Sequence, residues 1–364
     1  MKTVEIKLSQ NPYKVLVGEG IFENLSNEIS KKKLTQKRFF IIDKNVNLHY
    51  AERIRAAFTE LTSGNSIVLE AKESKKSFES LFKIYSKLLK KNYGRDSLII
   101  AIGGGIIGDV TGFAAATYMR GIKLIHVPTT LLSSVDSSVG GKTGVNFGDT
   151  KNIVGAFYQP ELVLIDTSFF KTLSKGEVIS GIGEVIKYGF LSDTKFYNYL
   201  KKNLHKLQNL DDIVLEKVIM ECVKLKGSVV ISDEKESGIR KVLNLGHTFA
   251  HAIEVDQNYK IKHGQAVIAG ISCAMYLSCK LNFITENALN EYFEIINALS
   301  SEIKIAEYNF NKLYALMRRD KKNRESKIKF VLIGGVGEIV LDAEANKSDV
   351  EYAVKCGLKI FTKR

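Results

Sequence analysis

The alternation of short apolar runs with helical patterns is the feature that most constrains the fold of this chain. Over about the first 165 residues, runs rich in β-branched residues are separated by segments in which apolar residues recur at helical spacing. A parallel sheet wrapped by helices requires this alternation. The runs expected to form strands are Arg38–Ile42, Ser66–Leu69, Ser97–Ile102, Lys123–Val127 and Leu162–Ile165. The first half is therefore predicted to be an α/β domain with a Rossmann-like parallel sheet.

After Asp166 the pattern becomes helical. The long amphipathic segments expected to form helices are 175–190, 211–230, 243–254, 264–281 and 286–299. Two extended runs, 328–333 and 338–341, are joined through a glycine-rich turn and are expected to pair. A chain of 364 residues is long enough for two domains. We therefore predict an α/β domain over residues 1–166 and a mainly α-helical domain over residues 167–364.

The composition is that of an ordinary folded protein, with 45% apolar and 26% charged residues. The four cysteines form no C-x-x-C pair and are too few for a disulfide framework, so we expect reduced thiols. The N-terminal segment lacks the apolar centre of a secretion signal and alternates like a strand. We therefore expect a cytoplasmic protein.

Membrane and nucleic-acid partners are not expected. The apolar stretch Leu98–Met119 contains Asp109 and three consecutive glycines, which would interrupt a lipid-facing helix. The formal net charge is +13, but the lysines are scattered over helical patterns in which they form solvated faces. Nucleic-acid-binding motifs are absent from the sequence. The charge alone therefore does not identify a partner.

A glycine-rich segment follows the expected strand at Ser97–Ile102. This segment, Gly103–Asp109, satisfies G-x-G-x-x-G between a strand and a helix, where glycines let the backbone approach a pyrophosphate. The acidic residue that usually follows about 20 positions later is missing, because residues 110–135 contain no Asp or Glu. Asp43, at the end of an earlier strand, is positioned to bind the adenosine ribose instead. A tight turn without a ligand is the alternative.

The segment Thr129–Gly144 is rich in hydroxyl groups and glycines and contains one lysine, Lys142. Small side chains leave backbone N–H groups accessible and a lysine adds a point charge, so the segment suits the capture of an anion. It is not a Walker A loop, because Asp136 stands where the first glycine of that motif belongs. A polar surface loop is the alternative.

Three of the six histidines, His247, His251 and His263, lie within 17 residues. The first two are four apart on an expected helix, so both rings project from one face and could bind the same ion. A third ligand would complete a catalytic zinc site. Glu184 is a candidate, and it precedes Lys187 by one helical turn in an otherwise apolar segment, where buried charges need partners. Histidines that only pack between helices, and a structural salt bridge, are the alternatives.

Taken together, these segments resemble 3-dehydroquinate synthase, a family of the sugar-phosphate cyclase superfamily. The resemblance covers nearly the whole chain, and its motifs are specific in this order and at this spacing. The motifs are Gly103–Asp109, Pro128–Leu132, Asp136–Thr143, Lys151–Asn152, Gly155–Phe157, Glu184–Gly189 and Asn244–Thr248. A dehydroquinate synthase-like fold is implied, in which residues 1–166 bind NAD and residues 167–364 bind the metal ion and the substrate.

The same resemblance implies the residues of the site. Glu184, His247 and His263 are expected to bind one divalent metal ion, zinc or cobalt. NAD is expected to contact Asp43, Asn45, Glu73, Lys76, Gly103, Gly104, Gly105, Asp109, Thr129, Thr130, Lys151, Phe169 and Thr172. The substrate, 3-deoxy-D-arabino-heptulosonate 7-phosphate, is expected to contact Arg120, Asp136, Lys142, Asn152, Lys187, Lys226, Arg240, Asn244, His251 and Lys321. Six of these are also expected to act in catalysis, namely Lys142, Lys187, Lys226, Arg240, Asn244 and His251.

The implied activity is that of a lyase of the shikimate pathway, which leads to chorismate and the aromatic amino acids. NAD transiently oxidises a substrate hydroxyl, phosphate is eliminated, the ketone is reduced again, and ring opening with an internal aldol closure gives 3-dehydroquinate. The resemblance also implies a homodimer. Another sugar-phosphate cyclase and a metal-dependent polyol dehydrogenase are the alternatives, and net accumulation of NADH would favour the dehydrogenase.

Two positions depart from the pattern of the family. Gln265 stands where relatives commonly carry glutamate, two residues after an expected metal ligand. Ala71–Lys72 replaces a more usual Gly-Glu before Glu73, on the adenosine side of the expected NAD site. In the basic pair near the end of the resemblance, Lys321 is preferred over Lys322 as the substrate contact.

Overall fold

The computed structural model describes residues 1–34, 37–148, 150–319 and 327–362. The chain divides into two compact units, one formed by Met1–Leu173 with Asp212–Lys235 and the other by Ser174–Asp211 with Glu236–Arg364. A single boundary at residue 166 therefore does not describe this division. The difference is helix α7 (Asp212–Ser232), which packs against the first two strands of the sheet and so belongs to the first unit.

The first unit is built on a seven-stranded sheet in the order β1-β2-β9-β6-β5-β3-β4. Its strands are β1 (Lys2–Ile6), β2 (Tyr13–Gly18), β3 (Arg38–Asp43), β4 (Ser66–Leu69), β5 (Leu98–Gly103), β6 (Lys123–Pro128) and β9 (Leu162–Asp166). β1 and β2 form an antiparallel hairpin, and the other neighbours are parallel. All five expected strands form, each within one residue of its predicted ends.

The order of the parallel strands creates a switch point between β3 and β5. The chain passes from β3 to β4 on one side, and then crosses back to β5 on the other side of β3. Crossover helices therefore leave the two strands on opposite faces, and in open parallel sheets ligands bind outside the carboxyl ends of the strands at such a point. β3 ends at Asp43 and β5 ends at Gly103.

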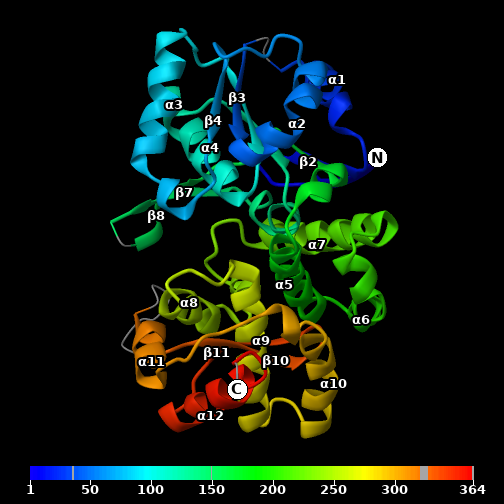
Figure 1. Ribbon diagram of the computed structural model, residues 1–364, viewed down its shortest axis with the longest axis vertical. Helices are drawn as coiled ribbons and strands as arrows, with labels where there is room; N and C mark the ends of the chain where they lie inside the picture. The colour runs from blue at the N-terminus through cyan, green and yellow to red at the C-terminus, as the bar shows by residue number, and fades with distance from the viewer. Residues whose placement is uncertain (35–36, 149, 320–326, 363–364) are drawn as a thin grey trace. The chain divides into compact units, whose positions relative to one another are not determined.

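Helices cover both faces of this sheet (Figure 1). Helices α3 (Phe78–Lys90) and α4 (Gly105–Thr117) lie on one face, and α1 (Leu25–Lys31) and α2 (Lys44–Ala57) lie on the other, as right-handed crossovers require. The core under α3 and α4 is apolar and includes Ile84, Ile99 and Ala114, each fully or almost fully buried. A rigid sheet therefore fixes the loops at its carboxyl edge.

A second hairpin, β7 (Lys142–Phe147) with β8 (Thr150–Phe157), packs on α4. Its Val145 joins the core beneath that helix. The segment that was expected to be an anion-binding or surface loop therefore forms a π-helical turn, η4 (Ser133–Ser137), followed by a strand. The alternating Thr143, Val145 and Phe147 explain the strand, because two of these residues face the core and the third is exposed.

The second unit is mainly helical, as predicted. Its helices are α5 (Lys175–Leu191), α6 (Thr194–Gln208), α8 (His247–Asp256), α9 (His263–Lys280), α10 (Glu286–Asn297), α11 (Phe310–Arg318) and α12 (Lys347–Leu358). The strands β10 (Phe330–Gly335) and β11 (Glu338–Ala343) pair as expected. α9 is central, because α5, α8, α10, α12 and β10 all pack against it.

Helix α8 begins four residues later than predicted. Residues Ile239–Asn244 form a 3₁₀ helix, η6, and Gly246 adopts a left-handed conformation with φ 75° before α8 starts. This break places His247 at the first position of α8. Among the helices that the structure describes, none is long and apolar enough to cross a membrane.

Candidate active site

Three side chains of the second unit converge, one from each of three helices. Glu184 lies within α5, and His247 and His263 are the first residues of α8 and α9. One donor atom from each of the three lies within 4.8 Å of the others. The Glu184 Oε1 atom is 3.2 Å from His263 Nε2 and 3.5 Å from His247 Nε2. Two imidazoles and one carboxylate form the ligand set of catalytic zinc sites that keep an open position.

The other ring nitrogen of each histidine has its own acceptor. His263 Nδ1 lies 3.2 Å from Glu254 Oε2, and His247 Nδ1 lies 3.1 Å from the carbonyl oxygen of Leu245. These contacts orient both rings so that their Nε2 atoms face Glu184. Metal-binding histidines show this arrangement almost always, so the donor set fits a divalent ion.

Charge in this cluster is balanced by a lysine. Glu184 is fully buried, and its carboxylate forms an ion pair with Lys187, which is 1% exposed. Burial opposes ionisation of Glu184, but Lys187 and the two imidazoles hold its pKa well below the usual range. Burial lowers the pKa of His247 to about 4, whereas the carboxylates of Glu184 and Glu254 outweigh burial and raise the pKa of His263 to about 10. A metal ion must therefore displace a proton from His263 to bind.

Each of the three side chains has a glycine as its chain neighbour, and the glycines set the spacing of the helices. A Cβ atom on Gly183 would overlap the backbone of Gly264, and one on Gly264 would overlap the Ser180 carbonyl. The Gly264 amide also donates to Ser180 Oγ at 3.1 Å. In the same way, a Cβ on Gly246 would lie 2.7 Å from the Ile271 amide nitrogen. The backbones of α5, α8 and α9 therefore approach closely enough for the three donors to meet, a signal that sequence reasoning missed.

Several expected substrate-side residues lie in the same unit. The His251 ring, one turn after His247, has its centroid 5.5 Å from that of His247. Arg240 is almost fully buried in η6, and Asn244 donates from Nδ2 to Glu236 Oε1 at 3.3 Å. The expected contact Lys321, with its neighbour Lys322, lies outside the described residues.

The expected NAD residues of the first unit gather at the carboxyl edge of its sheet. They end or follow the strands β3 (Asp43, Asn45), β4 (Glu73, Lys76), β5 (Gly103, Gly104, Gly105, Asp109), β6 (Thr129, Thr130) and β9 (Phe169, Thr172), and Lys151 lies on β8. Asp43 caps α2, because its Oδ1 accepts from the amides of Asn45 and Val46 at 2.7 and 3.3 Å. α4 begins at Gly105, so its first amides are directed at the switch point, as anion binding requires.

Phe169 takes part in the core rather than presenting its ring at this edge. The side chain is 1% exposed and its ring packs edge-on against Phe22 and Tyr50. Only the backbone of Phe169 remains for a contact at this edge. Its carbonyl oxygen accepts hydrogen bonds from the Tyr50 hydroxyl at 3.3 Å and the Thr172 hydroxyl at 3.4 Å.

Within the first unit, several of the expected site residues contact each other. Lys76, on the expected cofactor side, bonds through Nζ to Asp109 and to Asn152. Lys226, on α7, bonds through Nζ to the carboxylate and carbonyl of Asp136 at 2.7 and 2.6 Å. The latter pair joins α7 to the π-helical turn η4 of the first unit.

Arg120 lies away from the carboxyl edge. It follows α4 and precedes β6, so it stands at the amino edge of the sheet, and its side chain is exposed. Met119, Arg120 and Gly121 all have positive φ angles. Lys142 is also exposed. It pairs with Phe157 at the open end of the β7–β8 hairpin, away from the turn near Asn152. Within the first unit, Arg120 therefore lies apart from the expected substrate contacts Asp136, Asn152 and Lys226.

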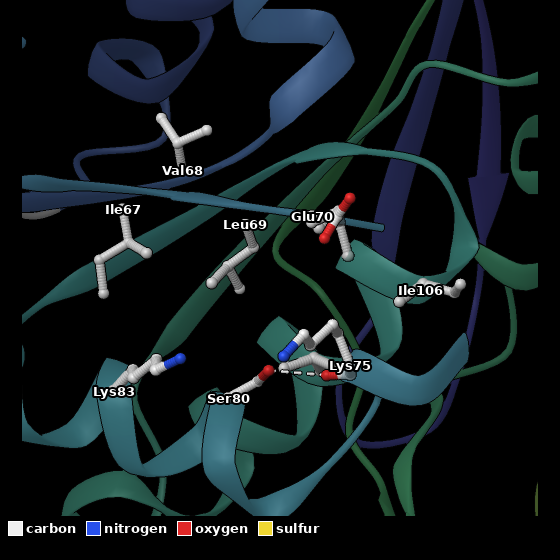
Figure 2. A pocket seen from close by; sticks show the side chains of 10 residues that line it. Ile67, Val68, Leu69, Glu70, Lys75, Ser80, Lys83 and Ile106 are labelled. Carbon is white, nitrogen blue, oxygen red and sulfur yellow. Dashed lines mark hydrogen bonds between the residues drawn. The ribbon is translucent and has the colours of Figure 1, made fainter. Parts of the chain in front are cut away.

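A hollow of about 200 Å³ lies beside β4, and sequence reasoning did not find it (Figure 2). Ile67 and Leu69 of β4 and Ile106 of α4 provide apolar walls, and Glu70 and Lys75 stand at its rim. Apolar walls with a few charged groups at the rim are typical of small-molecule pockets. Its position at the first turn of α4 makes it a neighbour of the glycine run.

The two departures from the family pattern have local explanations. Gln265 accepts at Oε1 from the Lys262 amide at 3.1 Å and donates from Nε2 to the Glu302 carbonyl at 3.0 Å, so both ends of the amide are used. A glutamate could make only the first bond. Lys72 forms an exposed ion pair with Glu70 at 2.7 Å, which contributes little to stability.

The sequence of this chain is similar to those of known 3-dehydroquinate synthases. The chain matches the family models of the 3-dehydroquinate synthase N-terminal domain over residues 66–180 and of the C-terminal domain over residues 181–323. A 3-dehydroquinate synthase of Shewanella halifaxensis is 39% identical over 98% of this chain and 99% of its own. One from Alkaliphilus metalliredigens is 39% identical over 93% of this chain and 94% of its own.

Solved structures of related enzymes share the fold. A 2-deoxy-scyllo-inosose synthase, solved with carbaglucose-6-phosphate, NAD+ and Co2+, has a TM-score of 0.88 at 24% identity and covers 97% of this chain and 99% of its own. The 2-epi-5-epi-valiolone synthase of Streptomyces hygroscopicus, solved with NAD+ and Zn2+, has a TM-score of 0.85 at 23% identity over 97% and 98% of the two chains. A probable glycerol dehydrogenase from Sinorhizobium meliloti scores 0.66 at 12% identity, covering 94% of this chain and 96% of its own.

This fold, with its parallel-rich sheet and helical second unit, is that of the sugar-phosphate cyclases. Within that class, the sequence matches decide the family. The chain belongs to the 3-dehydroquinate synthase family, whose members are phosphate-eliminating cyclases.

Proposed function

We propose that this chain converts 3-deoxy-D-arabino-heptulosonate 7-phosphate into 3-dehydroquinate and orthophosphate with one divalent metal ion and NAD. The observation that carries the proposal is the convergence of Glu184, His247 and His263 in a chain 39% identical to a curated 3-dehydroquinate synthase. The related inosose and valiolone synthases were solved with NAD+ and with Co2+ or Zn2+, which supports the same cofactors here.

Glu184, His247 and His263 would hold the metal ion. Bound there, a divalent ion supplies Lewis-acid polarisation of a substrate hydroxyl and eases removal of its proton. The chain contributes the orientation of the donors, since Glu254 and the Leu245 carbonyl fix both rings by their Nδ1 atoms. Lys187, paired with Glu184, keeps the carboxylate ionised and ready to bind.

The carboxyl edge of the sheet would bind NAD, which supplies the hydride acceptor and returns the hydride within one turnover. The α4 amides from Gly105 onward suit the pyrophosphate because they carry the positive end of the helix dipole. Asp43 suits the adenosine ribose because its carboxylate is held at the end of β3 by the cap of α2. The missing acidic residue after the glycine run is thereby replaced by one from the neighbouring strand.

The cations among the expected substrate contacts suit a substrate with one phosphate and one carboxylate. Arg240 is almost fully buried, and Lys226 is held by Asp136. Charges fixed in this way do not reorganise when the substrate's negative charge grows as phosphate leaves. They would favour a carboxylate-bearing substrate over sugar phosphates that carry no carboxylate.

His251 and Lys187 would handle protons. The His251 ring lies beside the two ligand imidazoles, and Lys187 lies one turn from Glu184. Substitutions His251→Ala and Lys187→Ala should each lower kcat by about 100-fold or more, as loss of a general acid or base does. Near-normal turnover of both variants would remove this role.

The family resemblance also leads us to propose a cytoplasmic homodimer. Exposed apolar side chains such as Phe82 and Phe147 offer surface for association. Light scattering coupled to size exclusion measures the assembly directly. A monomer at micromolar concentration would contradict the homodimer without affecting the proposed reaction.

Incubation of the metal-loaded protein with NAD and the heptulosonate phosphate tests the proposal. Orthophosphate and 3-dehydroquinate should appear in equal amounts, while NADH does not accumulate. Phosphate release only from sugar phosphates without a carboxylate would favour another cyclase. Net NADH formation with glycerol and no phosphate release would favour a polyol dehydrogenase.

A further inference from the structure

Asn146 stands at the one irregular point in the register of the β7–β8 hairpin, between Val145 and Phe147. At such a point the backbone leaves the ladder and its polar groups become available for other partners. The Asn146 amide accordingly donates to the Lys76 carbonyl at 2.8 Å rather than across the hairpin. Lys76 follows η2 (Glu73–Lys75), so this bond ties the hairpin to the segment after β4.

Both ends of the Asn146 side chain are used as well. Nδ2 donates to the Glu73 carboxylate at 2.8 Å and to the Glu73 carbonyl at 3.2 Å. Oδ1 accepts from the Asn152 amide at 2.9 Å. Asn152 has a positive φ of 51°, which costs energy for a residue with a side chain and persists only where neighbours hold it. Asn146 supplies such a hold.

A closed ring of contacts results. Asn146 binds Glu73 and Asn152, and Asn152 in turn accepts from Lys76 Nζ, which also bonds to Asp109. Lys76 is 5% exposed, so the contacts of its Nζ atom are partly shielded from water, where hydrogen bonds gain strength. The bond from the Asn152 amide to Asn146 is exposed. Glu73, Lys76 and Asp109 belong to the expected NAD side, and Asn152 belongs to the expected substrate side.

We propose that Asn146 is a positioning residue that couples the cofactor-side segment Glu73–Lys76 to the substrate-side Asn152. The proposal rests on the function proposed above. A ligand that orders one side of this ring of contacts also orders the other side through Asn146. Reciprocity then requires that each ligand increases the affinity for the other. Asn146 itself need not touch either ligand.

Two substitutions separate its bonds. Asn146→Asp keeps the acceptor for the Asn152 amide but replaces the donor to Glu73 by a carboxylate oxygen facing another carboxylate. Asn146→Ala removes both side-chain bonds and keeps the backbone bond to Lys76. A matched control is Asn65, which also accepts from a backbone amide (Thr62, 2.7 Å) and donates to a backbone carbonyl, and which precedes β4 at the opposite edge of the sheet.

The test measures the Kd of NAD by calorimetry without substrate, and the KM and kcat of the heptulosonate phosphate at saturating NAD. We expect Asn146→Asp and Asn146→Ala each to raise both the Kd and the KM by about five-fold or more, with kcat changed less. Asn65→Asp and Asn65→Ala should change neither constant. Added to Asn152→Ala, the Asn146→Ala change should raise the KM little further, because both act through one contact.

The outcomes are distinct. A lower melting temperature with unchanged Kd and KM would show a purely structural residue and overturn the proposal. A change in only one of the two constants would also overturn it, because coupling requires both. Should one variant fail to fold by circular dichroism, the other decides. Wild-type protein that neither binds NAD nor turns over would instead refute the proposed function.

Discussion

The substitution Gly264→Ala tests whether helix spacing builds the metal centre. The new Cβ atom would overlap the Ser180 carbonyl oxygen and lie 2.5 Å from the carbonyl carbon. Because carbon atoms pack at about 3.5 to 4.0 Å, α5 and the start of α9 must separate by about 1 Å. Metal sites tolerate ligand displacements of about 0.2 Å. Glu184 and His263, each adjacent in sequence to the contact, can then bind one ion together only with distorted geometry.

We expect this change to weaken zinc binding by about 100-fold, at the upper end of losses seen when ligand orientation is disturbed. Overpacking should also lower the free energy of unfolding by about 1–3 kcal/mol. Competition with a chelating zinc indicator measures the affinity, and circular dichroism confirms the fold. The matched control is Gly176→Ala on α5, where the nearest obstacle is the flexible Lys262 side chain at 3.1 Å. Wild-type zinc affinity in a folded Gly264→Ala protein would refute the reasoning.

Three further predictions concern groups that support the site or the sheet. Glu254→Ala should lower zinc affinity about 10- to 100-fold because His263 Nδ1 loses its acceptor; Glu254→Gln, which keeps an acceptor, should lose less in the same chelator competition. Gln265→Glu should lower the free energy of unfolding in urea by about 1 kcal/mol, since a carboxylate oxygen would face the Glu302 carbonyl; no change would contradict the amide's double role. Asp166 is buried, yet hydrogen bonds from backbone amides, a hydroxyl and a guanidinium hold its pKa below 3.8. Its ionised form therefore stabilises the fold above about pH 4, and that contribution is lost as pH falls through the lowered pKa. Asp166→Asn should cost about 2 kcal/mol at pH 7, with a gap from wild type that narrows in acid; a gap independent of pH would contradict the assignment.

The strands of the sheet could be predicted because their signal is local. Runs such as 38–42 and 98–102 are apolar and β-branched, and turn residues bound them. The β7–β8 hairpin escaped prediction because Gly140 and Gly141 precede it and the register is irregular at Asn146. Helix α6 was not among the long helices expected, although apolar residues recur along it and its lysines were expected on a solvated helix face.

The ligand set could be reached from the sequence only through the family resemblance. Helical spacing favoured His247 with His251, whereas the structure brings His247 together with His263 and Glu184. The reason is tertiary, because backbone contacts at glycines decide which helix starts face each other. Glycines next to Glu184, His247 and His263 were visible in the sequence, but their meaning depends on contacts between distant segments. The association of α7 with the sheet has the same long-range origin.

That association has a consequence for how the chain is made. When only the residues up to 173 have left the ribosome, the surface of β1 and β2 that α7 covers in the folded protein is exposed to solvent. Ile6 then lacks its contact with Gly227. The sheet can assemble at that stage, but its last layer arrives only after an excursion of the chain through residues 174–211. A fragment cut at the end of the sheet would therefore expose apolar surface, whereas a fusion of Met1–Leu173 to Asp212–Lys235 would retain the covering helix.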